Sequence, residues 1–205
     1  MTQKTFRVAV CLYQRVTMTD FQGPVELLGI LSSNNRERAL NGIRPHVSKD
    51  LPDLNIEFTY LSHTMDPVQP TAGPLILPSL TSLPDFIKRQ SPGAQYILTV
   101  CTGSLILART GLLNGKRATT NKSAFRQVTE ETKDLPITWV AKARWVVSED
   151  KKIWTGSGIT AGMDLAGGFL DHLVGRELGF AMRAFIELSA KDENDDEFAA
   201  YRGLV

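Results

Sequence analysis

A continuous apolar run at residues 96–100 (YILTV) leads directly into Cys101. The run has the length and composition of a strand buried on both faces. A stretch with helical spacing, residues 105–108, follows almost at once and stops at Gly111, where a left-handed helix end costs little. A strand that becomes a helix around one residue is the geometry of a nucleophile elbow, a tight turn that lifts one side chain above the sheet edge.

Cys101 in such a turn lies at a helix N-terminus. Unpaired first-turn N–H groups and the helix dipole there favour thiolate over thiol, so we expect the pKa to fall below the free value of about 8.5. Gly103 is expected to let the backbone fold closely beneath the thiol. The competing interpretation is a buried structural cysteine, which is the commoner fate of a single cysteine.

Strand and helix patterns alternate along the rest of the chain, which predicts a parallel sheet between helices. The expected strands are residues 6–12, 56–61, 75–77 (closed by Pro78), 137–140, 145–147 and 153–155. The expected helices are residues 25–31, 85–90, 123–132, 161–174 and 177–188, the first of them begun by Pro24. Residues 32–45 are polar and predict a loop, and the acidic stretch at residues 191–197 predicts a solvated loop before a final turn at 198–201.

Composition excludes several classes of protein. A length of 205 residues with 42% hydrophobic residues fits a single domain, residues 1–205, with a core that needs no disulfide or metal. A net charge of +1 without a basic block disfavours a nucleic-acid partner. Apolar runs are too short for a membrane span and the N-terminus lacks a secretory pattern, so we expect a cytoplasmic protein. The two cysteines are far apart and no metal-ligand spacing occurs, so no metal site is expected.

Three segments resemble the DJ-1/PfpI superfamily, in the order and spacing of that family. They are residues 100–120 (VCTGSLILARTGLLNGKRATT), 20–26 (DFQGPVE) and 155–166 (TGSGITAGMDLA). The nearest subgroup contains isocyanide hydratase and the amidotransferase-like domains of some transcription regulators. The resemblance implies one flavodoxin-like α/β domain with a parallel-rich central sheet flanked by helices, a cysteine nucleophile, no cofactor and a homodimer.

The resemblance also assigns roles to particular residues. Asp20 occupies the place of an acid that lies beside the sulfur, and Glu26 matches a second, frequently acidic position. Thr102 and Gly103 at the elbow are expected to contribute to substrate or oxyanion binding. Gly158, Ile159 and Thr160 are expected to line the pocket opposite the cysteine. Read without the resemblance, an Asp before Gly-Pro is a turn or cap residue and a single Glu on a helix is solvated.

Two departures from the family pattern limit the chemistry. Many members carry a histidine after the Arg-Ala-Thr-Thr segment, where this chain has Asn121, so a Cys-His dyad is absent there. Peptidase chemistry, which relies on imidazole, is therefore disfavoured. The family's Pro-Gly-Gly type turn, which helps to bind an oxyanion, is replaced by Leu-Pro-Ser-Leu at residues 77–80. Either Ser79 serves as a donor in a rebuilt loop, or one oxyanion contact is lost.

The three histidines, His46, His63 and His172, lie in polar stretches or on a helix and are expected to be surface or capping residues. A thiolate and one carboxyl group remain as the expected machinery. The leading hypothesis is a cofactor-free hydro-lyase that converts an isocyanide, a small electrophilic substrate, to an N-substituted formamide. The alternatives are a glyoxalase-type enzyme acting on 2-oxoaldehydes and a non-catalytic protein that senses a ligand or the redox state.

Overall fold

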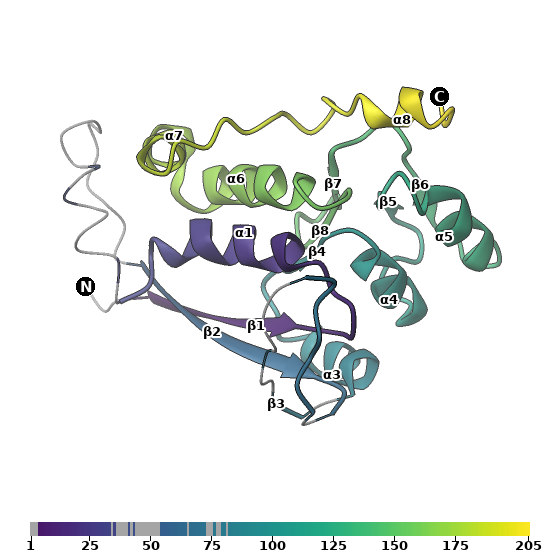
Figure 1. The fold of residues 1–205 in the computed structure, drawn as a ribbon, viewed down its shortest axis with the longest axis horizontal. Coiled ribbons are helices and arrows are strands. Elements are labelled where there is room, and N and C mark those ends of the chain that lie inside the picture. Colours follow the sequence, from purple (N-terminus) through teal and green to yellow (C-terminus); the bar gives the residue numbers. More distant parts are fainter. Residues whose placement is uncertain are drawn as a thin grey trace.

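The computed structural model describes residues 4–33, 35, 41, 43, 54–64, 66–72, 76, 79–80 and 82–205. Most of the predicted loop at 32–45 lies outside these residues. His46 and Pro78 also lie outside them. Of the predicted strand at 75–77, only Ile76 is described. The described part is a mixed α/β fold in which parallel strands are flanked by helices (Figure 1). The predicted fold class is therefore confirmed.

The strands form three hydrogen-bonded groups. The first has the order β1 (Lys4–Cys11), β2 (Leu54–Ser62), β3 (Ser79–Leu80), and all of its pairs are parallel. In the second, β4 (Ile97–Thr99) pairs parallel with β8 (Ile153–Gly156), which pairs antiparallel with β7 (Trp145–Val147). In the third, β5 (Arg117–Ala118) pairs parallel with β6 (Thr138–Trp139).

Helices cover both faces of the β4–β8 pair. The helices are α1 (Met18–Gly29), α3 (Leu83–Gln90), α4 (Gly103–Arg109), α5 (Phe125–Glu131), α6 (Ala161–Val174), α7 (Arg176–Phe185) and α8 (Phe198–Tyr201). Helices α1, α6 and α7 form one layer, with α6 between the other two (Figure 1). Trp154 of β8 packs into the core beneath this layer, whereas its neighbour Ile153 packs into a second core with residues of α3 and α4.

Helix α1 begins earlier than expected, and Pro24 lies inside the helix and not at its start. Proline lacks the N–H that would bond the carbonyl of Asp20 four residues before it, which normally breaks a helix. Packing compensates here, because α1 lies against α6 at Gly162, where an added Cβ would be 3.3 Å from the Asp20 carbonyl oxygen. The earlier start places Asp20 in the first helical turn and not in a loop.

Other boundaries differ in smaller ways. Of the strand predicted at residues 75–77 only Ile76 is described, and it forms an isolated bridge with Val68, whereas β3 at Ser79–Leu80 was not predicted. Strand β4 is half-buried and not fully buried as predicted, since within the described sheet it pairs only with β8. Helix α6 spans the predicted residues without any shift.

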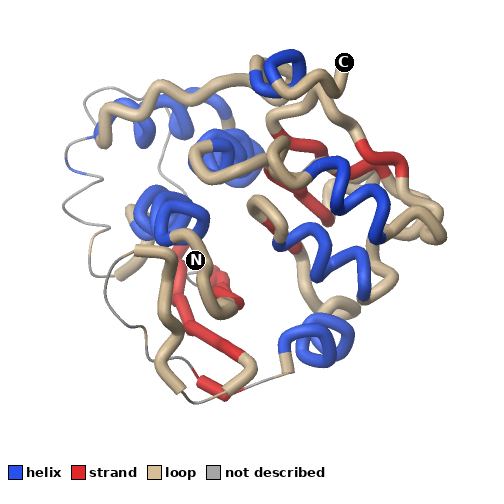
Figure 2. Tube along the Cα trace, turned by 45° about the vertical axis from the view of Figure 1, so that its right-hand side comes forward, coloured by secondary structure: helices blue, strands red, loops and turns tan. Residues whose placement is uncertain are grey.

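The acidic stretch at residues 191–197 is a loop that precedes α8, and most of its residues are exposed, so the prediction of a solvated loop is confirmed except at Asp196. It belongs to the connection from α7 to α8, which crosses above α6 in the view of Figure 1, and Figure 2 shows the same part of the chain as a long loop that leads to the C-terminus. Asp196 is buried and forms an ion pair with buried Lys122. Charge counting along the sequence missed this contact because the two residues are far apart in the chain.

Among the residues described, no helix combines the length and apolar character required to span a bilayer.

Candidate active site

Cys101 lies between β4 and α4 in a left-handed backbone conformation, with a φ of +58°. A non-glycine residue in this region is strained by roughly 1–2 kcal/mol, so the surrounding bonds must hold it. The Cys101 N–H donates to the carbonyl of Ser157 at 2.8 Å. The Cys101 carbonyl accepts from Ser104 Oγ at 3.0 Å and Thr120 Oγ1 at 3.1 Å. The geometry expected of a nucleophile elbow is therefore present.

Asp20 reaches the same site from the first turn of α1 and is 6% exposed. Burial raises the pKa of its carboxyl group from 3.8 to about 6, and the backbone N–H of Ile159 and the Cys101 thiol partly oppose this rise. Its Oδ1 atom is buried and has no hydrogen-bond partner in the described part of the chain. The Asp20 carboxyl group thus has one oxygen free to exchange a proton with a bound molecule.

The side chain of Asn121 contacts the sulfur directly. Its Nδ2 donates to Cys101 Sγ at 3.0 Å. Its Oδ1 accepts from the backbone N–H of Ser123 at 2.8 Å and from Ser123 Oγ at 2.7 Å, which fixes which end of the amide faces the sulfur. The sequence identified Asn121 only as the replacement for a histidine. The Ser two positions later was the available signal, because Asn side chains commonly bond the backbone two residues on.

The pKa of Cys101 differs from the prediction. Burial raises it, and the nearby charge of Asp20 raises it further, while Asn121 and the backbone N–H groups of Thr102 and Ile159 lower it. The expected fall was wrong because desolvation of a thiolate outweighs these donors. At neutral pH the site therefore holds a protonated thiol beside an ionised carboxylate, which can take the thiol proton during attack.

Gly158 and Gly103 have different structural roles. A Cβ at Gly158 would lie 2.6 Å from Asn121 Nδ2, so a side chain there is incompatible with the observed amide position. A Cβ at Gly103 would meet only Thr99 Cβ at 3.7 Å, an ordinary contact. The expectation that Gly103 permits a close backbone approach at the elbow was wrong, and the tight approach lies on the opposite side, at Gly158.

We expect Gly158→Ala to displace the Asn121 amide from the sulfur. Loss of one hydrogen bond is worth about 0.5–1.5 kcal/mol, so alkylation of Cys101 at neutral pH should slow by roughly two- to tenfold. Stopped-flow or mass-spectrometric alkylation rates with iodoacetamide measure this. Gly103→Ala is the matched control and should react like the wild type. Equal slowing in both variants would contradict the assignment.

Of the remaining predicted pocket residues, Ile159 and Thr102 face the sulfur, whereas Thr160 holds the neighbouring loop in place. Ile159 is in a left-handed conformation, with a φ of +47°, and its N–H faces both Asp20 and Cys101. Thr102 presents its N–H to the sulfur. Thr160 supports the loop from outside, since its Oγ1 accepts from Arg144 Nη2 at 2.9 Å.

Tyr13 is a site neighbour that sequence reasoning did not identify. Its hydroxyl lies 3.4 Å from Thr102 Oγ1. Burial raises the pKa of the Tyr13 hydroxyl, and the charges of Cys101 and Asp20 raise it further. No local pattern marked this residue, because its proximity depends on how β1 and β4 lie together.

The structure does not place Glu26 with the other site residues. Its side chain is exposed on α1, and its charge raises the pKa of Tyr60. Ser79 is the first residue of β3, and its side chain lies outside the described atoms. His63 and His172 are exposed, in agreement with the expected surface positions, and His172 Nε2 lies 3.2 Å from the Tyr96 hydroxyl.

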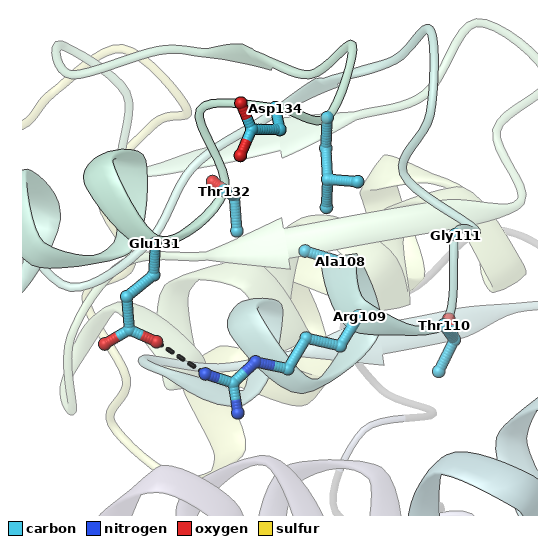
Figure 3. Close-up of a pocket in the computed structure, with 8 residues that line it drawn as sticks. Ala108, Arg109, Thr110, Gly111, Glu131, Thr132 and Asp134 are labelled. Atoms are coloured by element: carbon cyan, nitrogen blue, oxygen red, sulfur yellow. Dashed lines mark hydrogen bonds and ion pairs between the residues drawn. The ribbon is translucent and has the colours of Figure 1, made fainter.

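A separate surface cavity lies between α4 and α5 and contains none of the predicted site residues (Figure 3). Arg109 and Glu131 face each other across it and form an ion pair of 2.5 Å. Both side chains are substantially exposed, so solvent screens this pair. The residues that line the cavity include no cysteine, histidine or lysine.

Cys101 is expected to be the reactive thiol and Cys11 the inert one. Burial raises the pKa of Cys11, on β1, to about 11, and no hydrogen bond opposes that rise. At Cys101, three N–H groups oppose the effect of burial. Peptide mapping after limiting iodoacetamide should find Cys101 labelled first. Preferential labelling of Cys11 would contradict the site assignment.

The chain is similar to known proteins in both sequence and fold. Residues 72–172 match the DJ-1/PfpI family. The chain is 33% identical to isonitrile hydratase of Pseudomonas putida over 174 residues, which cover 82% of this chain and 72% of that protein. The chain therefore belongs to the DJ-1/PfpI family.

Two further proteins are similar to this chain, one in fold and one in sequence. A ThiJ/PfpI family protein from Pseudomonas syringae has a similar fold, with a TM-score of 0.68 and 21% identity over 97% of this chain and 85% of that one. The HTH-type transcriptional regulator GbdR of Pseudomonas aeruginosa is 34% identical over 101 residues, which are 49% of this chain but only 25% of the regulator. The chain is thus similar to an enzyme over most of its length and to a regulator over half of it.

Proposed function

We propose that this protein is a cofactor-free isocyanide hydratase with Cys101 as its nucleophile. The observation that carries the proposal is the pairing of the Cys101 thiol with the buried carboxyl group of Asp20. Isocyanide hydration needs a nucleophile and a proton shuttle, and it needs no imidazole to protonate an amine leaving group. Similarity to isonitrile hydratase over most of the chain supports the same substrate class.

The first half of the reaction joins the sulfur to the substrate. Cys101 Sγ attacks the terminal carbon of R–NC while the thiol proton passes to the Asp20 carboxylate. Asp20 then delivers that proton to the same carbon, which gives a thioimidate, Cys–S–CH=N–R. The N–H groups of Asn121, Thr102 and Ile159 face the sulfur and stabilise negative charge on it before the bond forms.

The second half releases the product. Asp20, again ionised, takes a proton from water as the water oxygen adds to the thioimidate carbon, and it passes this proton to the substrate nitrogen. In the collapse of this adduct the hydroxyl group loses its proton and becomes the formamide carbonyl, the C–S bond breaks, and Asp20 passes that proton to Cys101 Sγ as R–NH–CHO leaves. The net reaction adds one water to one isocyanide. The unpartnered Oδ1 of Asp20 is suited to accept from that water.

The sensor alternative has one specific observation in its favour, the 34% identity to a transcriptional regulator over 101 residues. In this alternative the site binds an electrophile or is oxidised at Cys101 without turnover. The glyoxalase alternative uses the same two residues, with the sulfur adding to the aldehyde of a 2-oxoaldehyde and Asp20 moving a proton between carbons.

One experiment separates the three functions. The protein is incubated with an alkyl isocyanide and, in parallel, with methylglyoxal, and the formamide or hydroxy acid product is followed by proton NMR. Cys101→Ala is the control for each reaction. Formamide formation that depends on Cys101 supports the hydratase. Conversion of methylglyoxal alone supports the glyoxalase, and no turnover of either, with ligand-induced stabilisation, supports the sensor.

We also propose that the protein is a homodimer, as its family resemblance implies. Phe180 and Phe185 on α7 are 67% and 44% exposed and offer apolar surface for contact between copies. Light scattering at high micromolar concentration should give about twice the 22.6 kDa mass of one chain. A single species at the monomer mass would contradict this proposal.

A further inference from the structure

We propose that residues 191–199, here called the C-terminal segment, hold the Cys101 site in its reactive geometry, with Lys122 and Asp196 as positioning residues. This deepens the proposed function, since it concerns the reactivity of the same thiol. It depends on Cys101 being the nucleophile but not on the identity of the substrate. Three sets of contacts carry the inference.

The first set surrounds Lys122, which directly follows the amide donor Asn121. The Lys122 side chain is 4% exposed, and its Nζ donates to Thr119 Oγ1 at 3.0 Å and to the Ala143 carbonyl at 2.7 Å. Burial lowers the pKa of Lys122, and the negative charge of Asp196 opposes that change. A buried ammonium group fixed in this way holds the backbone beside Asn121.

The second set surrounds Asp196, the partner of Lys122. Its carboxyl group is fully buried and lies 3.4 Å from Lys122 Nζ through Oδ2. Its Oδ1 accepts from the N–H groups of Phe198 at 2.9 Å and Ala199 at 3.2 Å, which ties the carboxylate to the start of α8. Removing one member of a buried pair leaves the other charge uncompensated, at a typical cost of about 3–5 kcal/mol.

The third set is a series of backbone hydrogen bonds that ends at the nucleophile. The Glu193 carbonyl accepts from Arg144 N–H at 2.5 Å, and the Arg144 carbonyl accepts from Ser157 N–H at 2.9 Å. The Ser157 carbonyl in turn accepts from Cys101 N–H at 2.8 Å. The C-terminal segment therefore lies three hydrogen bonds from the strained Cys101 peptide.

A buried ion pair strengthens the same connection. The Arg144 guanidinium contacts Asp164 at 2.7 Å and donates to Thr160 Oγ1 at 2.9 Å, beside the Ile159 N–H that faces the sulfur. Asp164 also accepts from the backbone N–H of Lys191 at 3.0 Å. Two of the three segments that present donors to Cys101, at Asn121 and at Ile159, are thus each anchored to the C-terminal segment through a buried cation.

The test measures the rate of iodoacetamide alkylation of Cys101 across pH 6 to 10 in the full chain, with Cys11→Ala as the background. Lys122→Met and Asn121→Ala should each move the rate–pH profile to higher pH and slow alkylation at pH 7 by roughly two- to tenfold, the worth of one hydrogen bond. Because Lys122 acts through Asn121, the double variant Lys122→Met with Asn121→Ala should be alkylated no more slowly than Asn121→Ala alone.

Glu197→Gln is the matched control. Glu197 is next to Asp196 in the chain, but its 2.9 Å ion pair with Lys191 is solvent-exposed, so its loss should leave the profile unchanged. Asp196→Asn should shift the profile in the same direction as Lys122→Met. If circular dichroism shows that either single variant is unfolded, the double variant Lys122→Met with Asp196→Asn is used, because it removes both charges and leaves no unpaired buried charge.

A wild-type profile in folded Lys122→Met, or in the folded pair, would overturn the proposal. So would strictly additive effects of Lys122→Met and Asn121→Ala, since these would show two independent influences. Alkylation requires no turnover of isocyanide. A protein that fails to hydrate isocyanides can therefore still support or refute this role of the C-terminal segment.

Discussion

Isocyanide hydration by the Asp20→Asn variant should be slower than that of the wild type by about 100- to 10,000-fold, the usual cost of losing a general acid or base. Asparagine keeps the shape of the side chain and can accept from the Ile159 N–H, but it can neither take the thiol proton nor return it to carbon. The rate of formamide formation at saturating isocyanide measures the effect, with circular dichroism to establish that the variant is folded.

Glu26→Gln is the matched control, on the same helix. Because the Glu26 side chain is exposed and outside the group around Cys101, its loss should change the rate less than about tenfold. Normal turnover in Asp20→Asn together with an inactive Glu26→Gln would transfer the acid role to Glu26 and contradict the site described above.

The same Asp20→Asn variant should be more stable than the wild type at neutral pH. Burial raises the folded-state pKa of Asp20 to about 6, above its ordinary value of 3.8, so the folded protein binds the proton more tightly than the unfolded chain does. Stability contributed by this group is therefore lost as pH rises from about 4 through 6. Asparagine carries no such cost, and we expect a gain of about 1–3 kcal/mol at pH 7.5.

Urea unfolding at two pH values measures this gain. At pH 7.5 the carboxyl group is ionised in both states and the full difference should appear. Well below pH 3.8 it is protonated in both states, and the difference between variant and wild type should shrink. A destabilised variant at pH 7.5, or a gain that grows on acidification, would show that the Asp20 carboxylate is held favourably in the folded protein.

Local patterns predicted the parts of the fold that local interactions determine. The apolar run before Cys101 and the helical spacing after it indicated the elbow, and helix α6 was predicted without shift because apolar residues recur on one of its faces. Pro24 misled the prediction of α1, since tertiary packing against Gly162 tolerates a proline inside a helix.

Electrostatics at the site could not be predicted from neighbours in the sequence. A helix N-terminus suggested a lowered pKa for Cys101, but the extent of its burial and the approach of Asp20 depend on how α1 and β4 are brought together. Lys122 and Asp196 are ordinary surface residue types whose burial follows from the path of the C-terminal segment. Asn121 was identified only by what it replaced, although it contacts the sulfur.

The close approach of Gly158 to the Asn121 amide links the two positions in any protein that shares this backbone. A side chain at position 158 requires the residue at position 121 to be smaller or to turn away from the sulfur. Variation at these two positions among relatives should therefore be correlated. A glycine at 158 would mark those chains in which a polar side chain at 121 can reach the cysteine, and a larger residue there would mark those in which it cannot.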